Sequence, residues 1–325
     1  MLKPLGNTGL PVGPLIVGGN VFGWTIDEQR SFEVLDAFFA GGATMIDTAD
    51  AYYAYVPGNV GGESETIIGR WMKARGNRDK VQVATKVGLL EIKGEKGLKT
   101  SVIETAIENS LRRLQTDYVD LYFAHADDES VPQEEVAETF DRLVKAGKVR
   151  LLGASNFSQA RLESALDISD AAGLAGYAVL QPQLNLMAAG AFPESYRAFC
   201  AERGMGVMTF FALASGFLSG KYRKPEDAQN SSRSAALNRY FNARGNAVLA
   251  ALDSVSAETG ATLAQIALAW IIATPGVTGP IVSATSVEQV EGLLPATTLK
   301  LEPAQMALLD AASQTPVGSG SFTAS

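Results

Sequence analysis

Short apolar runs alternate with amphipathic stretches along most of the chain. The runs are continuously hydrophobic, which is typical of parallel strands covered on both faces. The predicted strands span residues 15–19, 44–48, 81–87, 118–123, 149–154, 179–183, 207–211 and 280–284. The predicted helical stretches lie near residues 28–40, 63–74, 100–115, 132–146, 158–169, 194–203 and 238–273.

This alternation predicts an α/β fold, either a closed eight-stranded parallel (β/α)8 TIM-type barrel or an open doubly wound sheet. An open dinucleotide-binding sheet carries Gly-x-Gly-x-x-Gly between its first strand and a helix. Here Gly-Gly-Asn-Val-Phe-Gly at 18–23 lacks the helix at the required spacing, so we favour the barrel. No linker divides the chain, and we expect residues 1–325 to form a single domain.

Three segments lie outside the plain repeat. Residues 58–62 lengthen the loop after the second predicted strand, and a long loop over about 214–235 follows the seventh. We expect residues 314–325 to form a flexible C-terminal tail. In a TIM-type barrel the chemistry lies on the loops that follow the strands, so long loops there are candidates for function.

Composition and charge exclude several classes of function. The 46% hydrophobic and 19% charged residues are typical of a globular protein. A net charge of −8 argues against nucleic acid or an anionic membrane as the main partner. The single cysteine excludes an internal disulfide and a Cys-based zinc site, and we expect no metal. Without an apolar run of membrane-spanning length or a signal core, we expect a cytoplasmic protein.

Four ionisable residues stand at or just after the ends of three successive predicted strands: Asp47, Tyr52, Lys86 and His125. A lysine that ends an apolar strand is costly to bury unless its charge has a partner, and Asp47 on the neighbouring strand is a natural one. An isolated pair of this kind would be a structural ion pair, and a lone histidine is usually structural. The equivalent depth of all four favours a functional site.

These side chains suit proton transfer to a carbonyl oxygen. A tyrosine hydroxyl has a pKa of about 10, and we expect the Lys86 ammonium to lower the pKa of Tyr52. Tyr52 would then act as general acid or base, while Asp47 holds Lys86 and His125 orients the carbonyl. The set contains no electron source. It therefore predicts a carbonyl reductase or alcohol dehydrogenase that takes its hydride donor from outside the chain.

Segments along nearly the whole chain resemble the aldo-keto reductase family. They are Leu-Gly-Asn-Thr-Gly-Leu at 5–10, Asp-Thr-Ala-Asp-Ala-Tyr at 47–52, Gly-Glu-Ser-Glu at 62–65, Thr-Lys at 85–86, Gly-Ala-Ser-Asn-Phe at 153–157, Gly-Phe-Leu-Ser-Gly-Lys-Tyr at 216–222 and Ala-Leu-Ala-Trp at 267–270. The resemblance implies that the family's catalytic tetrad corresponds to Asp47, Tyr52, Lys86 and His125. It also implies a barrel that binds a nicotinamide cofactor extended across its top.

The resemblance further implies a cofactor site. Ser155, Asn156 and Gln181 resemble the residues that hydrogen-bond the nicotinamide carboxamide, and Phe210 stands where an aromatic ring stacks on it. The complete set implied for the cofactor is Gly19, Asn20, Asp47, Ser155, Asn156, Gln181, Phe210, Phe211, Ala212, Leu213, Ser215, Gly216, Leu218, Lys221, Arg233, Ser283, Thr285 and Gln289.

The adenosine end departs from the family pattern. Gly292 and Leu293 replace the usual Glu-Asn pair, and no lysine or arginine follows the eighth strand to bind a 2′-phosphate. Arg233 resembles the arginine that some branches use for this purpose. We therefore expect NADP(H), with NAD(H) as the alternative.

Aromatic residues suggest the walls of a substrate pocket, although they would equally suit sealing of the barrel mouth. The proposed wall residues are Phe22, Trp24, Tyr53, Tyr55, Met187 and Phe192. The expected partner is a small-molecule carbonyl or alcohol, and an oligomer is left open. One alternative is a redox-sensing or regulatory subunit that binds the cofactor, as potassium-channel β subunits of this family do. A second, a lyase with Lys86 as Schiff-base nucleophile, is disfavoured because Asp47 would keep that lysine protonated.

Overall fold

The fold is a closed barrel of eight parallel strands in the spatial order β10-β3-β4-β5-β6-β7-β8-β9. It is seen in a computed structural model that describes residues 2–231 and 233–317. The strands are β3 (Ile16–Gly18), β4 (Met45–Asp47), β5 (Gln82–Val87), β6 (Val119–Ala124), β7 (Val149–Ser155), β8 (Tyr177–Gln181), β9 (Gly206–Thr209) and β10 (Gly279–Val282). Each overlaps a predicted strand, with ends shifted by at most two residues, so the barrel prediction is confirmed and the open-sheet alternative is excluded.

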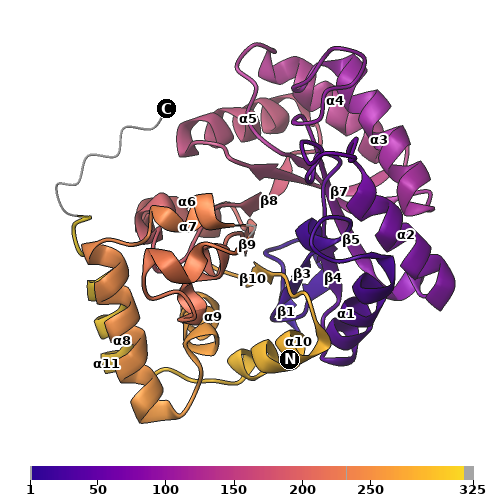
Figure 1. The fold of residues 1–325 in the computed structure, drawn as a ribbon. Coiled ribbons are helices and arrows are strands. Elements are labelled where there is room, and N and C mark those ends of the chain that lie inside the picture. Colours follow the sequence, from indigo (N-terminus) through magenta and orange to yellow (C-terminus); the bar gives the residue numbers. More distant parts are fainter. Residues whose placement is uncertain (1, 232, 318–325) are drawn as a thin grey trace.

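Helices surround the strands (Figure 1). They are α1 (Glu28–Ala40), α2 (Glu63–Arg75), α3 (Thr100–Leu114), α4 (Gln133–Lys145), α5 (Gln159–Ala172), α6 (Glu194–Glu202), α7 (Ser234–Asn238), α8 (Ala243–Thr259), α9 (Leu263–Ala273), α10 (Val287–Leu293) and α11 (Pro303–Ser313). Of these, α7, α10 and α11 were not predicted. The tail expected over 314–325 lies outside the described residues from 318 onward.

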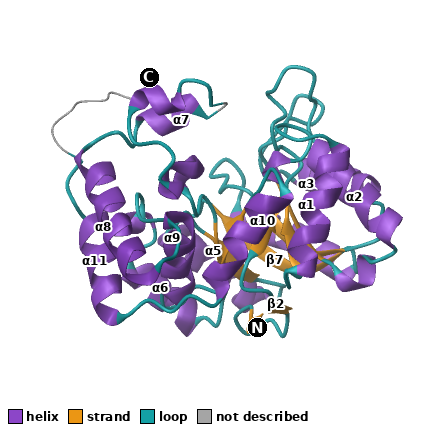
Figure 2. Cartoon of the chain, turned by 60° about the horizontal axis from the view of Figure 1, so that its bottom comes forward, coloured by secondary structure: helices purple, strands orange, loops and turns teal. Residues whose placement is uncertain are grey.

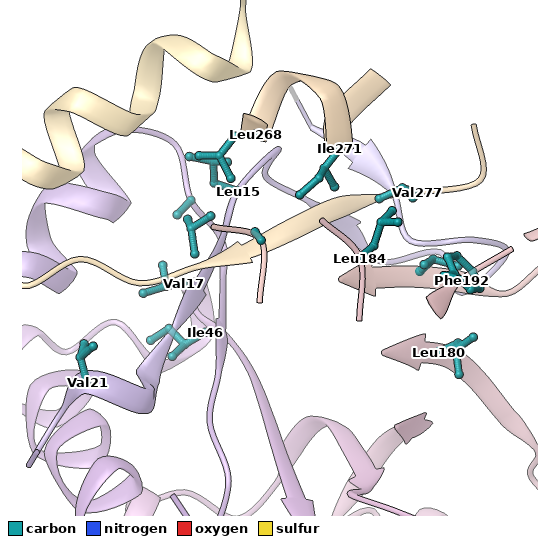
Figure 3. Packing of buried hydrophobic residues seen from close by; sticks show 14 of the residues in the cluster. Leu15, Val17, Val21, Ile46, Leu180, Leu184, Phe192, Leu268, Ile271 and Val277 are labelled. Carbon is teal, nitrogen blue, oxygen red and sulfur yellow. The ribbon is translucent and has the colours of Figure 1, made fainter. Parts of the chain in front are cut away.

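The strands separate two buried layers. Ile16 on β3 and Met45 on β4 belong to the cluster inside the barrel, whereas their neighbours Val17 and Ile46 belong to the layer between strands and helices (Figure 3). Successive strand residues point to opposite faces, so both faces must be apolar. This two-sided burial explains why the strands are continuous hydrophobic runs in the sequence.

A short N-terminal hairpin, β1 (Lys3–Pro4) paired with β2 (Pro11–Val12), lies at one end of the barrel. Its side chains Leu5 and Val12 are fully buried in the interior cluster. The hairpin and the N-terminus lie on the opposite side of the strands from α7 (Figure 2). The end that carries α7 is therefore the end left open for a site.

The helical stretch expected over 238–273 is wrong as one element, because the chain forms two helices there, α8 and α9. Gly260 ends α8 with a left-handed φ of 71°, and Thr262 begins α9 with a capping box to Gln265. Among the described residues no single helix has the length and apolarity to cross a membrane, and only α8 with α9, bent by 96°, meets that test as a pair.

Gly153→Ala tests the packing inside the barrel. A Cβ on Gly153 of β7 would overlap the ring of Phe123, which is fully buried on the neighbouring strand. We expect the free energy of unfolding to fall by about 1–3 kcal/mol in chemical denaturation. Gly292→Ala on α10 is the control, because its Cβ meets nothing within 4 Å and alanine favours a helix. Equal stability of both variants would contradict this account.

Candidate active site

The four tetrad candidates meet at the carboxyl ends of neighbouring strands. Asp47 is the last residue of β4, Lys86 lies near the end of β5, and His125 follows β6 directly. Tyr52 lies on the loop after β4. Because β4, β5 and β6 are adjacent in the barrel, the fold brings these residues to one place.

Lys86 is the centre of a hydrogen-bond network. Its Nζ donates to Asp47 Oδ1 at 2.7 Å and Oδ2 at 2.8 Å, to Tyr52 Oη at 2.7 Å and to the Thr48 carbonyl at 2.8 Å. Tyr52 Oη in turn donates to Asp47 Oδ2 at 2.8 Å, and Gln181 Nε2 donates to Oδ1 at 2.7 Å. The ammonium, the carboxylate and the phenol therefore form one continuous path for a proton.

The pKa of Tyr52 is shifted in the opposite direction from the one expected. Burial raises it well above its usual value, and the carboxylate of Asp47 adds to the increase. Burial also lowers the pKa of Lys86, while Asp47 opposes that decrease. The expectation that Lys86 lowers the pKa of Tyr52 is wrong here, because burial and Asp47 both favour the neutral phenol. The Tyr52 phenol is thus protonated at neutral pH.

His125 stands beside Tyr52 as a neutral imidazole. Its ring is edge-on to the Tyr52 ring, with centroids 6.0 Å apart and an angle of 75°. Burial and the charge of Lys86 lower the pKa of His125 to about 3. Its backbone amide donates to the Val87 carbonyl, and its carbonyl accepts from Asn156 Nδ2 at 2.8 Å. Its Nδ1 is buried and has no hydrogen-bond partner among the described residues.

A cavity of about 1190 Å³ opens over this network. Asp47, Tyr52 and His125 line it, whereas Lys86 lies behind them with 0% of its surface exposed. The predicted residues that line it are Asn20, Trp24, Asp47, Tyr53, Tyr55, Ser155, Asn156, Gln181, Phe210, Phe211, Ala212, Leu213, Ser215, Gly216, Lys221, Arg233, Ser283 and Gln289. With Leu89 after β5, residues from all eight barrel strands or their following loops thus line this one cavity.

Several predicted site residues lie elsewhere. Phe22, Met187 and Phe192 are buried in the layer between strands and helices, so they are wrong as pocket walls (Figure 3 labels Phe192). Their apolar side chains complete the core instead of the cavity surface. The cofactor candidates Gly19, Leu218 and Thr285 also lie outside the lining: Gly19 and Leu218 are buried, and the Thr285 hydroxyl donates to Gln289.

The remaining aromatic candidates form one wall. Trp24 and Tyr53 stack with ring centroids 3.7 Å apart and an angle of 16°. Tyr55 follows at 5.6 Å from Tyr53 and is 80% exposed. Arg233 lies over the Trp24 ring, with its guanidinium carbon 5.6 Å from the ring centroid. Flat apolar faces thus line the cavity beside Tyr52.

Some lining residues were not predicted. They are Gly18, Ala51, Ala54, Leu89, Ser219, Ala235, Ala236, Thr262, Ala264, Ile281, Val282, Gly292 and Leu293. Most are small or aliphatic, and their residue types carry no chemical signal. Gly292 and Leu293 were recognised only as departures from the family pattern, and Thr262 could have been found through the capping box that begins α9.

The cavity also fits an extended anionic ligand. Lys221 and Arg233 line it, and neither makes an ion pair with a carboxylate of the described chain. The loop beside them is held in unusual backbone conformations, with φ of 47° at Ala214, 59° at Ser215 and 93° at Gly216. Unpaired cations next to such a loop are typical of phosphate binding. The residues present therefore fit a nicotinamide dinucleotide. The described residues contain no cluster of three or more His, Cys, Asp or Glu that could hold a metal.

Comparison with known proteins identifies the family. The profile of the aldo/keto reductase family matches residues 14–314. An uncharacterised oxidoreductase, YrpG of Bacillus subtilis, is 32% identical over 94% of this chain and 94% of its own length. An NADP(+) aryl-alcohol dehydrogenase of Phanerodontia chrysosporium is 28% identical over 93% and 83%. A probable voltage-gated potassium channel subunit beta of Arabidopsis thaliana is 30% identical over 89% and 88%.

The closed parallel barrel and the family match define the class as a nicotinamide-dependent oxidoreductase. The chain belongs to the aldo/keto reductase family.

Proposed function

We propose that this protein reduces an aldehyde or ketone to an alcohol, or catalyses the reverse reaction, with NADP(H). The observation that carries the proposal is the hydrogen bond from Lys86 Nζ to Tyr52 Oη at 2.7 Å, at the floor of a cavity that neutral His125 also lines. When bound, a nicotinamide cofactor supplies or accepts the hydride. The residues of this chain would bind the reactants and move the proton.

Tyr52 is the general acid of the reduction. The raised pKa keeps its phenol protonated, and Lys86 offers a proton from behind as negative charge develops on Oη. Asp47 holds Lys86 in place through both carboxylate oxygens. His125 is neutral and therefore offers one N–H, and with Nδ1 buried we assign that donor to Nε2, facing the carbonyl oxygen.

The aromatic wall supports a planar, ring-bearing carbonyl as substrate. Trp24, Tyr53 and Tyr55 offer flat faces at one side of the cavity, and Leu89 and Phe211 add exposed apolar surface. Aromatic rings gain from offset stacking beyond simple burial. The aryl-alcohol dehydrogenase among the relatives agrees with this proposal.

The function is tested by following loss of reduced-cofactor absorbance with matched aromatic and aliphatic aldehydes and ketones. We expect turnover with NADPH and a higher kcat/KM for the aromatic members. Preference for the aliphatic members would contradict the substrate class. Tight cofactor binding with no turnover on any carbonyl would instead support a redox-sensing subunit. Borohydride trapping of a Lys86 adduct would support a lyase, which the complete burial of that lysine disfavours.

The preference for NADP(H) rests on Arg233 as the partner of the 2′-phosphate. We expect Arg233→Ala to raise the Kd for NADPH by about 10–100-fold and to leave the Kd for NADH unchanged, because a hydrogen bond to a charged group contributes about 1.5–3 kcal/mol. Isothermal titration calorimetry measures both. Arg223→Ala is the matched control, since Arg223 lies on the same loop and pairs with Asp253 at 2.7 Å. Equal NADH use, unaffected by Arg233→Ala, would overturn the preference.

A further inference from the structure

Asp50 is a buried carboxyl group without a partner, two residues before the catalytic tyrosine. It is 0% exposed, and neither side-chain oxygen has a hydrogen-bond partner of standard geometry among the described residues; the Ala51 amide still acts on its charge as a weak backbone donor. Its own amide donates to the Lys86 carbonyl at 3.4 Å, so it is attached to the strand that carries the central lysine. An unpaired buried carboxylate is costly, and a group in this position takes up a proton.

The charges around Asp50 leave it without a cation. Glu65 on α2 is 0% exposed and accepts from Arg113 Nε of α3 at 2.6 Å. Lys86 of β5 is paired with Asp47 at 2.7 Å. Arg113 and Lys86 are thus each paired with another carboxylate, and Asp50 is left without a cation.

The same groups determine its protonation. Burial raises the pKa of Asp50 to about 8 and Glu65 adds to the increase, while Arg113, the Ala51 amide and Lys86 oppose it. Tyr122 on β6 also interacts with Asp50, and its buried hydroxyl lacks a hydrogen-bond partner among the described residues. Burial raises the pKa of Tyr122 well above its usual value, so it stays neutral.

We propose that Asp50 is a positioning residue of the catalytic site: as a neutral acid it leaves Lys86 to act on Tyr52, and as a carboxylate it slows proton transfer from Tyr52. The added negative charge would stabilise the protonated forms of Lys86 and Tyr52, which makes both weaker acids. Asp50 acts through Lys86 and does not touch the substrate. This inference rests on the proposed reductase function.

The test is the pH profile of single-turnover carbonyl reduction, measured by stopped-flow with the best aldehyde of the panel. We expect the wild-type rate to fall above about pH 8 and the Asp50→Asn rate to show no break there, since asparagine is isosteric with the neutral acid. Asp117→Asn, an exposed acid on the α3–β6 loop, should keep the wild-type profile. A break that persists in Asp50→Asn would overturn the proposal and assign the ionisation to Lys86.

Glu65→Gln is expected to shift the pH of the break without removing it. It removes the second carboxylate and leaves Arg113 to face Asp50, so the break should move to lower pH. An unchanged break in this variant would also overturn the proposal. If Asp50→Asn and Glu65→Gln both turn over with the wild-type pH profile, only the role of Asp50 is overturned. If the wild type reduces no carbonyl at all, the proposed function is overturned and the role of Asp50 with it.

A stability measurement checks the protonation of Asp50 without catalysis. In the unfolded chain an aspartate has a pKa of about 3.9. A raised folded pKa contributes stability that is fully present below about pH 4 and is lost as pH rises towards about 8. We expect the unfolding free energy of wild type, relative to Asp50→Asn, to decrease over that interval and then level. A constant difference would overturn the proposal.

Discussion

Tyr52→Phe is expected to lower the rate of carbonyl reduction by about 10²–10⁴-fold, the usual contribution of a positioned general acid. Phenylalanine keeps the ring but removes the hydroxyl that accepts from Lys86 and donates to Asp47. The ring that faces His125 and the cavity is retained, so cofactor binding should be unchanged. Steady-state kinetics with NADPH and an aromatic aldehyde measure the loss, and calorimetry measures the Kd of the cofactor.

Tyr53→Phe is the control for this variant, and the pH profile of both proteins adds a second check. Tyr53→Phe removes a hydroxyl from the adjacent residue, which stacks on Trp24 and lies outside the Lys86 network, and it should retain most of the activity. A neutral His125, with its pKa near 3, should add no ionisation close to pH 6.5 in either protein. Turnover at the wild-type rate in Tyr52→Phe would remove the tyrosine from the mechanism.

The barrel and the meeting of Asp47, Lys86 and His125 at one end of it were predictable for one physical reason. Parallel strands covered on both faces are continuous apolar runs, so a charged residue at the end of such a run is conspicuous. Asp47, Lys86 and His125 are conspicuous in this way, and the barrel brings their strand ends together. The break between α8 and α9 was also present in the sequence, as Gly260 followed by Thr262, but the apolar pattern continues through it.

What could not be predicted depends on burial. An aromatic residue after a strand suits the cavity wall or the core equally, so its residue type does not decide between them. Trp24 lines the cavity, whereas Phe192 is buried in the core. The pKa of Tyr52 follows from how completely the site is enclosed, which residue types do not reveal. Asp50 resembles an ordinary loop acid in the sequence. Only the folded chain pairs every nearby cation with another group.

Lys86→Met is expected to lower both stability and activity. Removing the ammonium leaves the Asp47 carboxylate buried without its cation, and a broken buried ion pair costs about 3–5 kcal/mol of unfolding free energy. The same change removes the proton donor behind Tyr52. We therefore expect a loss of turnover of about 10²-fold or more, of the order expected for losing a general acid. Denaturant unfolding and steady-state kinetics measure the two effects separately.

The double variant Lys86→Met with Asp47→Asn separates the two roles of the ion pair. Asparagine carries no charge and can still accept from Gln181 Nε2, so the buried carboxylate that destabilises the single variant is gone. Most of the lost unfolding free energy should return, whereas turnover should stay low because Tyr52 still lacks its proton source. If activity returned together with stability, Lys86 would serve only to hold the fold. If neither returned, the destabilisation would come from lost packing around the lysine chain and not from the unpaired Asp47.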